Sequence, residues 1–141
     1  MAIDASIVKC LLDELLALQG MLVVVDSGGA VAELHPPAGM KPEFEDEWAM
    51  LEAGAWHVHL NLRRIDGVQF VEAEDRFHSF PKLYYVRMSD ERGGTTIRFY
   101  FPNPWLDDTE RPTDFQPEKL RLFEGVRNRY VGIGGVVFVR R

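Results

Sequence analysis

The architecture of this chain can be worked out from residues 82–101, which read KLYYVRMSDERGGTTIRFYF. In the second half of this segment, apolar side chains such as Ile97 and Phe99 alternate with more polar ones, which is typical of a strand with one buried face. Two consecutive glycines precede that strand and give the backbone the freedom that a tight loop needs. The segment therefore predicts a β-hairpin, with strands over residues 82–88 and 95–101.

Outward from this hairpin, the same alternation recurs, and apolar residues at helical spacing occur in three other places. The sequence predicts further strands over residues 21–25, 30–35, 56–64, 68–74 and 133–139. It predicts helices over residues 4–19, 42–53 and 117–130, each with an apolar stripe. We therefore expect a single α+β domain over residues 1–141, in which a large, mostly antiparallel sheet is flanked by three helices.

The composition is that of an ordinary globular protein, and it narrows the possible functions. Across 141 residues there are 16 basic and 22 acidic side chains, and the net charge of −6 argues against a general nucleic-acid binder. The single cysteine, Cys10, excludes an internal disulfide and a Cys-x-x-Cys motif. The N-terminal segment lacks the pattern of a signal peptide, and no apolar run reaches the ~20 residues of a membrane span. We expect a cytoplasmic protein with no membrane or nucleic-acid partner.

The predicted strand over residues 56–63, WHVHLNLR, carries the most informative polar residues. By alternation, His57, His59, Asn61 and Arg63 project from one face of this strand. Neighbouring side chains on that face lie about 6.5–7 Å apart, so the two imidazoles can converge on one metal ion. The guanidinium could hold a carboxylate through two hydrogen bonds. The same pattern is also typical of a solvated sheet face that binds no ligand.

A mononuclear metal site built on His57 and His59 needs a third protein ligand. A small metal-dependent enzyme that uses this pair is therefore one hypothesis for the function. A cupin-type site does not fit, because no glutamate follows His59 at the required spacing. The candidate third ligands are His35, Glu72, Glu74 and His78.

Acidic, imidazole and hydroxyl side chains also lie close together in the sequence at Asp75, His78 and Ser79. A serine next to its histidine in sequence rarely points at it, and the chain has no Gly-x-Ser-x-Gly motif, so a hydrolase is disfavoured. We expect this segment to be a loop between strands that Phe77 and Phe80 anchor.

Residues 54–103 contain three tracts that together suggest a family. These are HLNLR (59–63), YYVRM (84–88) and TTIRFYFPN (95–103), with a return strand between the first two. This part of the chain resembles the bacterial haem-utilisation proteins of the HemS/ChuX-like superfamily. The resemblance implies antiparallel strands of a large sheet flanked by helices, a haem-binding cleft beside that sheet, and a role in cytoplasmic haem handling.

The resemblance also implies roles for particular residues. His57 would ligate the haem iron through a neutral ring nitrogen, and His59 would support or replace it. Arg63 and Arg98 would pair with propionates, and Tyr100 would cover a porphyrin face. Some relatives use another histidine from the N-terminal half, for which the candidate in this chain is His35, although its spacing from His57 is short.

Three hypotheses follow. The first is a haem-binding carrier that is not an enzyme in its own right. The second is a fold relative without haem that acts as a dimeric, protein-binding scaffold. The third is the metal-dependent enzyme described above. Exposed sheet edges and a wide apolar arc on the first helix make a homodimer plausible in either of the first two cases.

Overall fold

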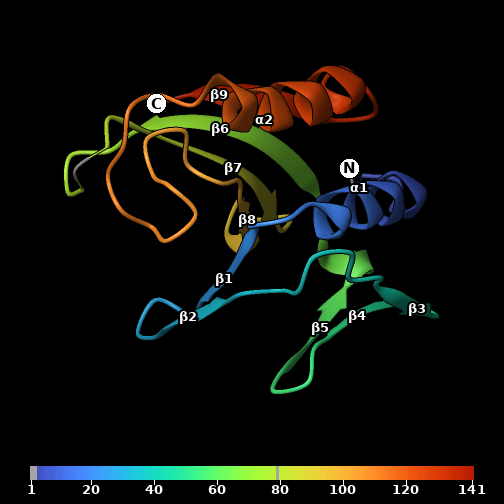
Figure 1. The fold of residues 1–141 in the computed structure, drawn as a ribbon. Coiled ribbons are helices and arrows are strands. Elements are labelled where there is room, and N and C mark those ends of the chain that lie inside the picture. The colour runs from blue at the N-terminus through green and yellow to red at the C-terminus, as the bar shows by residue number, and fades with distance from the viewer. Residues whose placement is uncertain (1–2, 79) are drawn as a thin grey trace.

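The structure is a computed structural model that describes residues 3–78 and 80–141 (Figure 1). Its main feature is a six-stranded sheet in the order β2-β1-β8-β7-β6-β9. All neighbouring strands are antiparallel except β6 and β9, which run parallel, so the sheet is mixed. The predicted hairpin is formed by β7 and β8. The strands are β1 (Leu22–Asp26), β2 (Val31–Leu34), β6 (Gly67–Glu74), β7 (Lys82–Ser89), β8 (Thr95–Tyr100) and β9 (Val136–Arg140).

A separate three-stranded antiparallel sheet has the order β3-β4-β5. Its strands are β3 (Glu43–Glu45), β4 (Trp48–Glu52) and β5 (His57–Asn61). Strand β5 ends earlier than predicted, because a 3₁₀ turn, η1 (Leu62–Arg64), follows it. The Asn61 side chain accepts a hydrogen bond from the Arg63 backbone N–H and fixes this change of direction.

The predicted helix over residues 42–53 is wrong, because this segment forms the β3–β4 hairpin. Its turn contains Asp46, whose φ of 53° lies in the left-handed region that Asp tolerates better than most residues. Phe44, Ala49 and Leu51 face the core in alternation, and β4 gains a full ladder with β5. This non-local pairing outweighs the helical spacing of the apolar residues.

The described part of the chain contains two α-helices rather than the three predicted: α1 (Ala5–Ala17) and α2 (Pro117–Tyr130). The Asp4 carboxylate caps α1 by accepting hydrogen bonds from the Ser6 backbone N–H and hydroxyl. Neither helix of the described residues is long and apolar enough to cross a membrane.

Both helices contribute to one core on the same face of the large sheet. In Figure 1, α2 lies along β6, and α1 lies between the large and small sheets. Phe123 of α2 is fully buried, and its ring contacts Phe70 and Tyr84 on that face. Strand alternation places Val71 and Tyr85 on the opposite face, where both are also buried but lie outside this core.

Candidate functional site

A cavity of about 690 Å³ lies where the ends of β1, β7 and β8 meet the irregular loop over residues 102–116. Its wall includes one imidazole and one phenol, from His35 and Tyr100. Lys119 is the basic side chain in its lining. The apolar part of the lining is made by Leu22, Phe80, Leu83, Phe101, Leu106 and Leu122.

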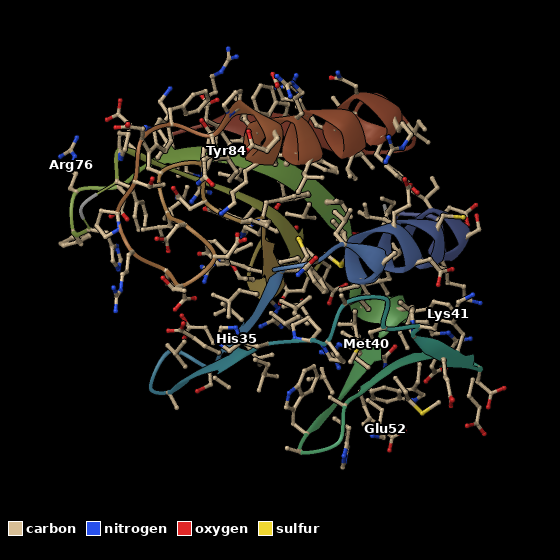
Figure 2. All side chains as sticks on the ribbon, viewed as in Figure 1. His35, Met40, Lys41, Glu52, Arg76 and Tyr84 are labelled. Carbon is tan, nitrogen blue, oxygen red and sulfur yellow. The ribbon has the colours of Figure 1, made fainter. Side chains whose placement is uncertain are left out.

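Strand pairing explains why residues from distant parts of the sequence line this cavity. Leu22 of β1 lies directly opposite Tyr100 of β8, so their side chains share one face of the sheet. Leu34, the last residue of β2, pairs with Val23, and His35 follows immediately at the same end of the sheet (Figure 2). His35 is exposed, and the described residues give its ring no hydrogen-bond partner.

The loop over residues 102–116 is held in place by hydrogen bonds within it and to β7 and α2. The Asn103 side chain donates to the Lys82 carbonyl over 2.7 Å and accepts from the Trp105 N–H over 2.9 Å. Gln116 and Lys119 both donate to the Leu106 carbonyl, over 2.6 and 2.7 Å. The cavity is therefore formed before any ligand arrives, which lowers the entropic cost of binding.

The acidic side of the cavity is mostly engaged in structural contacts. The Asp107 carboxylate accepts hydrogen bonds from the backbone N–H groups of Arg111 and Thr109 and from the Thr109 hydroxyl. The Arg111 N–H and the Thr109 groups lower the pKa of Asp107 below its ordinary value. Asp108 lies 3.2 Å from the Lys119 ammonium. Anionic groups of a ligand would therefore be repelled here and directed to the opposite side.

Beyond the cavity lining, the same face of the sheet carries a basic pair. Arg87 of β7 lies directly opposite Arg98 of β8, two positions along the strand from Tyr100 and on the same face. Like charges facing each other across a ladder destabilise a sheet unless an anion offsets them. Asp26 does so only in part, since its carboxylate lies 3.9 Å from Arg98. Burial, together with Arg141 and Arg98, lowers the pKa of Arg87.

Two aromatic rings lie between the basic pair and the cavity. The ring centroids of Tyr85 and Tyr100 are 4.7 Å apart, which is the distance of a favourable tilted contact. Burial raises the pKa of Tyr100, although Arg98 partly opposes that shift. Tyr100 is therefore a neutral phenol at physiological pH, suited to pack against a flat apolar ligand.

The predicted site residues lie in separate places. Tyr100 lines the cavity, and Arg98 lies on the same face of β8 but outside the cavity lining. His57 and His59 lie on the outward face of the small sheet and line neither of the two described hollows. Arg63 lines the second hollow, of about 740 Å³, between α1 and the small sheet. Its guanidinium lies 3.4 Å from the Glu47 carboxylate.

The proposed third metal ligands are not brought to the His57–His59 pair. Glu72 is held by Lys82 and Arg140, each at 3.4 Å. The His78 ring is held by Asp75, with 2.6 Å between Nδ1 and Oδ2. Within residues 3–78 and 80–141, no group of three or more His, Cys, Asp or Glu side chains is arranged to hold a metal ion.

The segment between β6 and β7 differs from the prediction in one respect. Phe80 anchors it as expected, because its side chain is buried and stacks on the His78 ring. Phe77 does not, because 94% of it is exposed. Ser79 lies outside the described residues.

Comparison with known proteins identifies the family. A protein-family model matches residues 9–130 of the chain. The chain belongs to the HemS/ChuX-like superfamily. The resemblance first seen in residues 54–103 is thereby confirmed over most of the chain. A search of curated proteins finds no match.

Solved structures show the HemS/ChuX-like fold directly. Protein AGR_C_4470 from Agrobacterium tumefaciens is 17% identical and has a TM-score of 0.68, over 90% of this chain and 69% of its own. ChuX is 9% identical with a TM-score of 0.70, over 92% of this chain and 75% of its own. Apo-PhuS from Pseudomonas aeruginosa is 14% identical with a TM-score of 0.61, over 87% of this chain and 33% of its own. These identities establish the fold alone.

Sequence reasoning named His35 only as a secondary candidate, because its spacing was judged against His57. The structure instead groups His35 with Tyr100, through the β2-β1-β8 order of the sheet. The signal that could have shown this is the position of His35 directly after a strand, before two prolines that end it.

Proposed function

We propose that the protein binds haem in the His35 cavity and carries it in the cytoplasm. The observation that carries the proposal is a preformed cavity of about 690 Å³ whose apolar wall includes one exposed imidazole. This volume lies within the range of roughly 300–1,000 Å³ that is typical of cofactor pockets, which are mostly apolar and contain few polar groups. The names of two similar proteins, ChuX and PhuS, describe them as haem-binding.

The residues at the cavity fit the chemistry of this group. Haem would supply an iron that takes a neutral imidazole nitrogen as a ligand, and His35 would provide that nitrogen. Tyr100 and the apolar lining would pack against the macrocycle and keep water from its faces. The basic pair, Arg87 and Arg98, would attract the propionates away from the acidic loop.

His57 is the competing ligand, predicted from the family resemblance. Its ring is exposed on the small sheet, and no described hollow adjoins it, so a haem bound there would leave one face in water. The cavity therefore favours His35, and the two assignments make opposite predictions for single variants.

The test is a titration of the purified protein with hemin, followed by the Soret absorbance. We expect saturable binding at one haem per chain, weakened at least tenfold by His35→Ala and unchanged by His57→Ala. Loss of binding in His57→Ala alone would overturn the cavity assignment. Absence of saturable binding to the wild type at micromolar hemin would overturn the haem function and favour the scaffold hypothesis. A homodimer, expected from the exposed sheet edges, would appear in light scattering of the same samples.

A further inference from the structure

The outward face of the small sheet is a second chemically distinctive surface that haem binding at His35 does not use. The register places Glu52 directly opposite His57, and Met50 directly opposite His59, so all four side chains share this face. Glu43, opposite Met50, extends the same face onto β3. Phe44, Leu51 and Leu60 point the other way, into the core.

The two imidazoles on this face are close enough to act together. The ring centroids of His57 and His59 are 5.2 Å apart, with 61° between the ring planes. With zinc–nitrogen distances of about 2.0–2.1 Å and tetrahedral angles, two imidazoles on one ion have centroids roughly 5 Å apart. Neither ring has a hydrogen-bond partner in the part of the chain that the structure describes, and both are exposed, so their nitrogens are accessible.

The charge around the pair favours a cation. Glu43, Glu45 and Glu52 are exposed on this face, and no ion pair is formed by any of them within the described residues. Imidazole nitrogens prefer zinc, copper and nickel over magnesium or calcium, which take oxygen ligands. The glutamates therefore attract cations to this surface, and the imidazole nitrogens favour zinc, copper and nickel among them.

We propose that His57 and His59 bind one divalent transition-metal ion from the zinc, nickel and copper class, independently of haem. No third His, Cys, Asp or Glu among the described residues completes the three-ligand set of a tightly held mononuclear ion, so the two imidazoles form a weaker site with two protein ligands. Water fills the remaining positions, since both rings face solvent. Copper(II) binds most tightly in the series, because sites of nitrogen donors follow the Irving–Williams order.

The experiment uses haem-free protein without a polyhistidine tag, titrated calorimetrically with NiCl₂, ZnCl₂, CuCl₂ and, for comparison, MgCl₂. We expect one ion per chain for the three transition metals and no binding of magnesium. His57→Ala and His59→Ala are each expected to weaken binding at least tenfold. His78→Ala, which removes an imidazole outside both proposed sites, is the matched control and should bind as the wild type does.

Two results would overturn the proposal. The first is no saturable binding of nickel, zinc or copper to the wild type, which would leave the ring pair as an edge-to-face contact only. The second is wild-type affinity in the His57→Ala, His59→Ala double variant, which would place the ion elsewhere. Hemin titration of that double variant separates the two functions, because it should bind haem normally whatever the outcome with metals. Both substituted side chains are exposed, so the fold should be retained, as circular dichroism would check.

Discussion

Arg87 donates a hydrogen bond from Nε to the Thr95 hydroxyl over 2.7 Å, joining the two strands of the β7–β8 hairpin. The same guanidinium donates to the Gln69 side chain on β6 and to the Gly93 carbonyl in the hairpin loop. One side chain thus connects three strands and the turn between two of them, on the face that carries Tyr100.

Arg87→Met keeps an unbranched apolar stem in place of the arginine stem and removes these hydrogen bonds. We expect the free energy of unfolding to fall by about 1–3 kcal/mol, because half-buried acceptors lose a charged donor. Urea denaturation measures the change. Arg92→Met, in the exposed part of the same hairpin, is the matched control and should change stability by less than about 0.5 kcal/mol. Equal effects of the two substitutions would show that the network does not stabilise the fold.

Asp46 provides a test of the segment for which sequence reasoning failed. In the β3–β4 turn its φ is 53°, where glycine is unstrained and a β-branched residue is disfavoured. Asp46→Gly should leave the free energy of unfolding unchanged or raise it by up to about 1 kcal/mol, whereas Asp46→Val should lower it by about 1–2 kcal/mol. A helix over residues 42–53 would give the opposite ranking, because valine is the better helix former. Thermal or urea unfolding of the two variants decides between them.

The same physical reason explains why the helix predicted over residues 42–53 was wrong and why the hairpin predicted over residues 82–101 was confirmed. Residues 82–101 carry strict alternation and a glycine turn, so local signals and the final pairing agree. In the 42–53 segment, Phe44, Trp48 and Leu51 fit helical spacing, while Phe44, Ala49 and Leu51 fit a hairpin whose turn falls at Asp46. The hairpin is favoured over the helix because β4 pairs with β5. That pairing joins separate segments of the chain, so the periodicity of residues 42–53 does not predict it.

The candidate site was predictable only in part, for a related reason. Arg98 and Tyr100 were named from the family resemblance, and strand alternation puts both on one face of β8, where Tyr100 lines the cavity and Arg98 does not. The position of His35 beside them depends on the strand order β2-β1-β8 and on an irregular loop with three prolines. Neither feature has a periodic signature, so residue type and spacing drew attention to the His57–His59 pair instead.

Asp107 makes the cavity wall sensitive to acid. Hydrogen bonds from the Arg111 N–H and Thr109 lower the pKa of this carboxyl in the folded state below its ordinary value of 3.8. Its contribution to stability is therefore complete above about pH 3.8 and is lost as the pH falls through the lower folded pKa. Asp107→Ala should lower the melting temperature at pH 7, and the difference from wild type should shrink below pH 3.8.

The control for this pH dependence is Asp114→Ala, an exposed carboxylate on the same loop for which no hydrogen bond is formed among the described residues. It should leave the melting temperature nearly unchanged at both pH values. Hemin affinity provides a second measurement, because a loosened loop would enlarge the cavity and weaken binding in Asp107→Ala. A constant melting-temperature difference from pH 7 to pH 3 would show that the carboxylate charge has no part in holding the loop.

Arg98 separates the recognition of haem carboxylates from the recognition of the macrocycle. Its guanidinium lies on the same face as Tyr100 and is only partly neutralised by Asp26 at 3.9 Å. A charge-assisted hydrogen bond is worth about 1.5–3 kcal/mol, so Arg98→Gln should weaken hemin binding roughly tenfold or more. Hemin dimethyl ester has no free carboxylate, and its affinity for the variant should equal its affinity for the wild type. Equal losses for both ligands would mean that Arg98 supports the shape of the sheet rather than contacting a propionate, and the basic pair would then have no role in orienting haem.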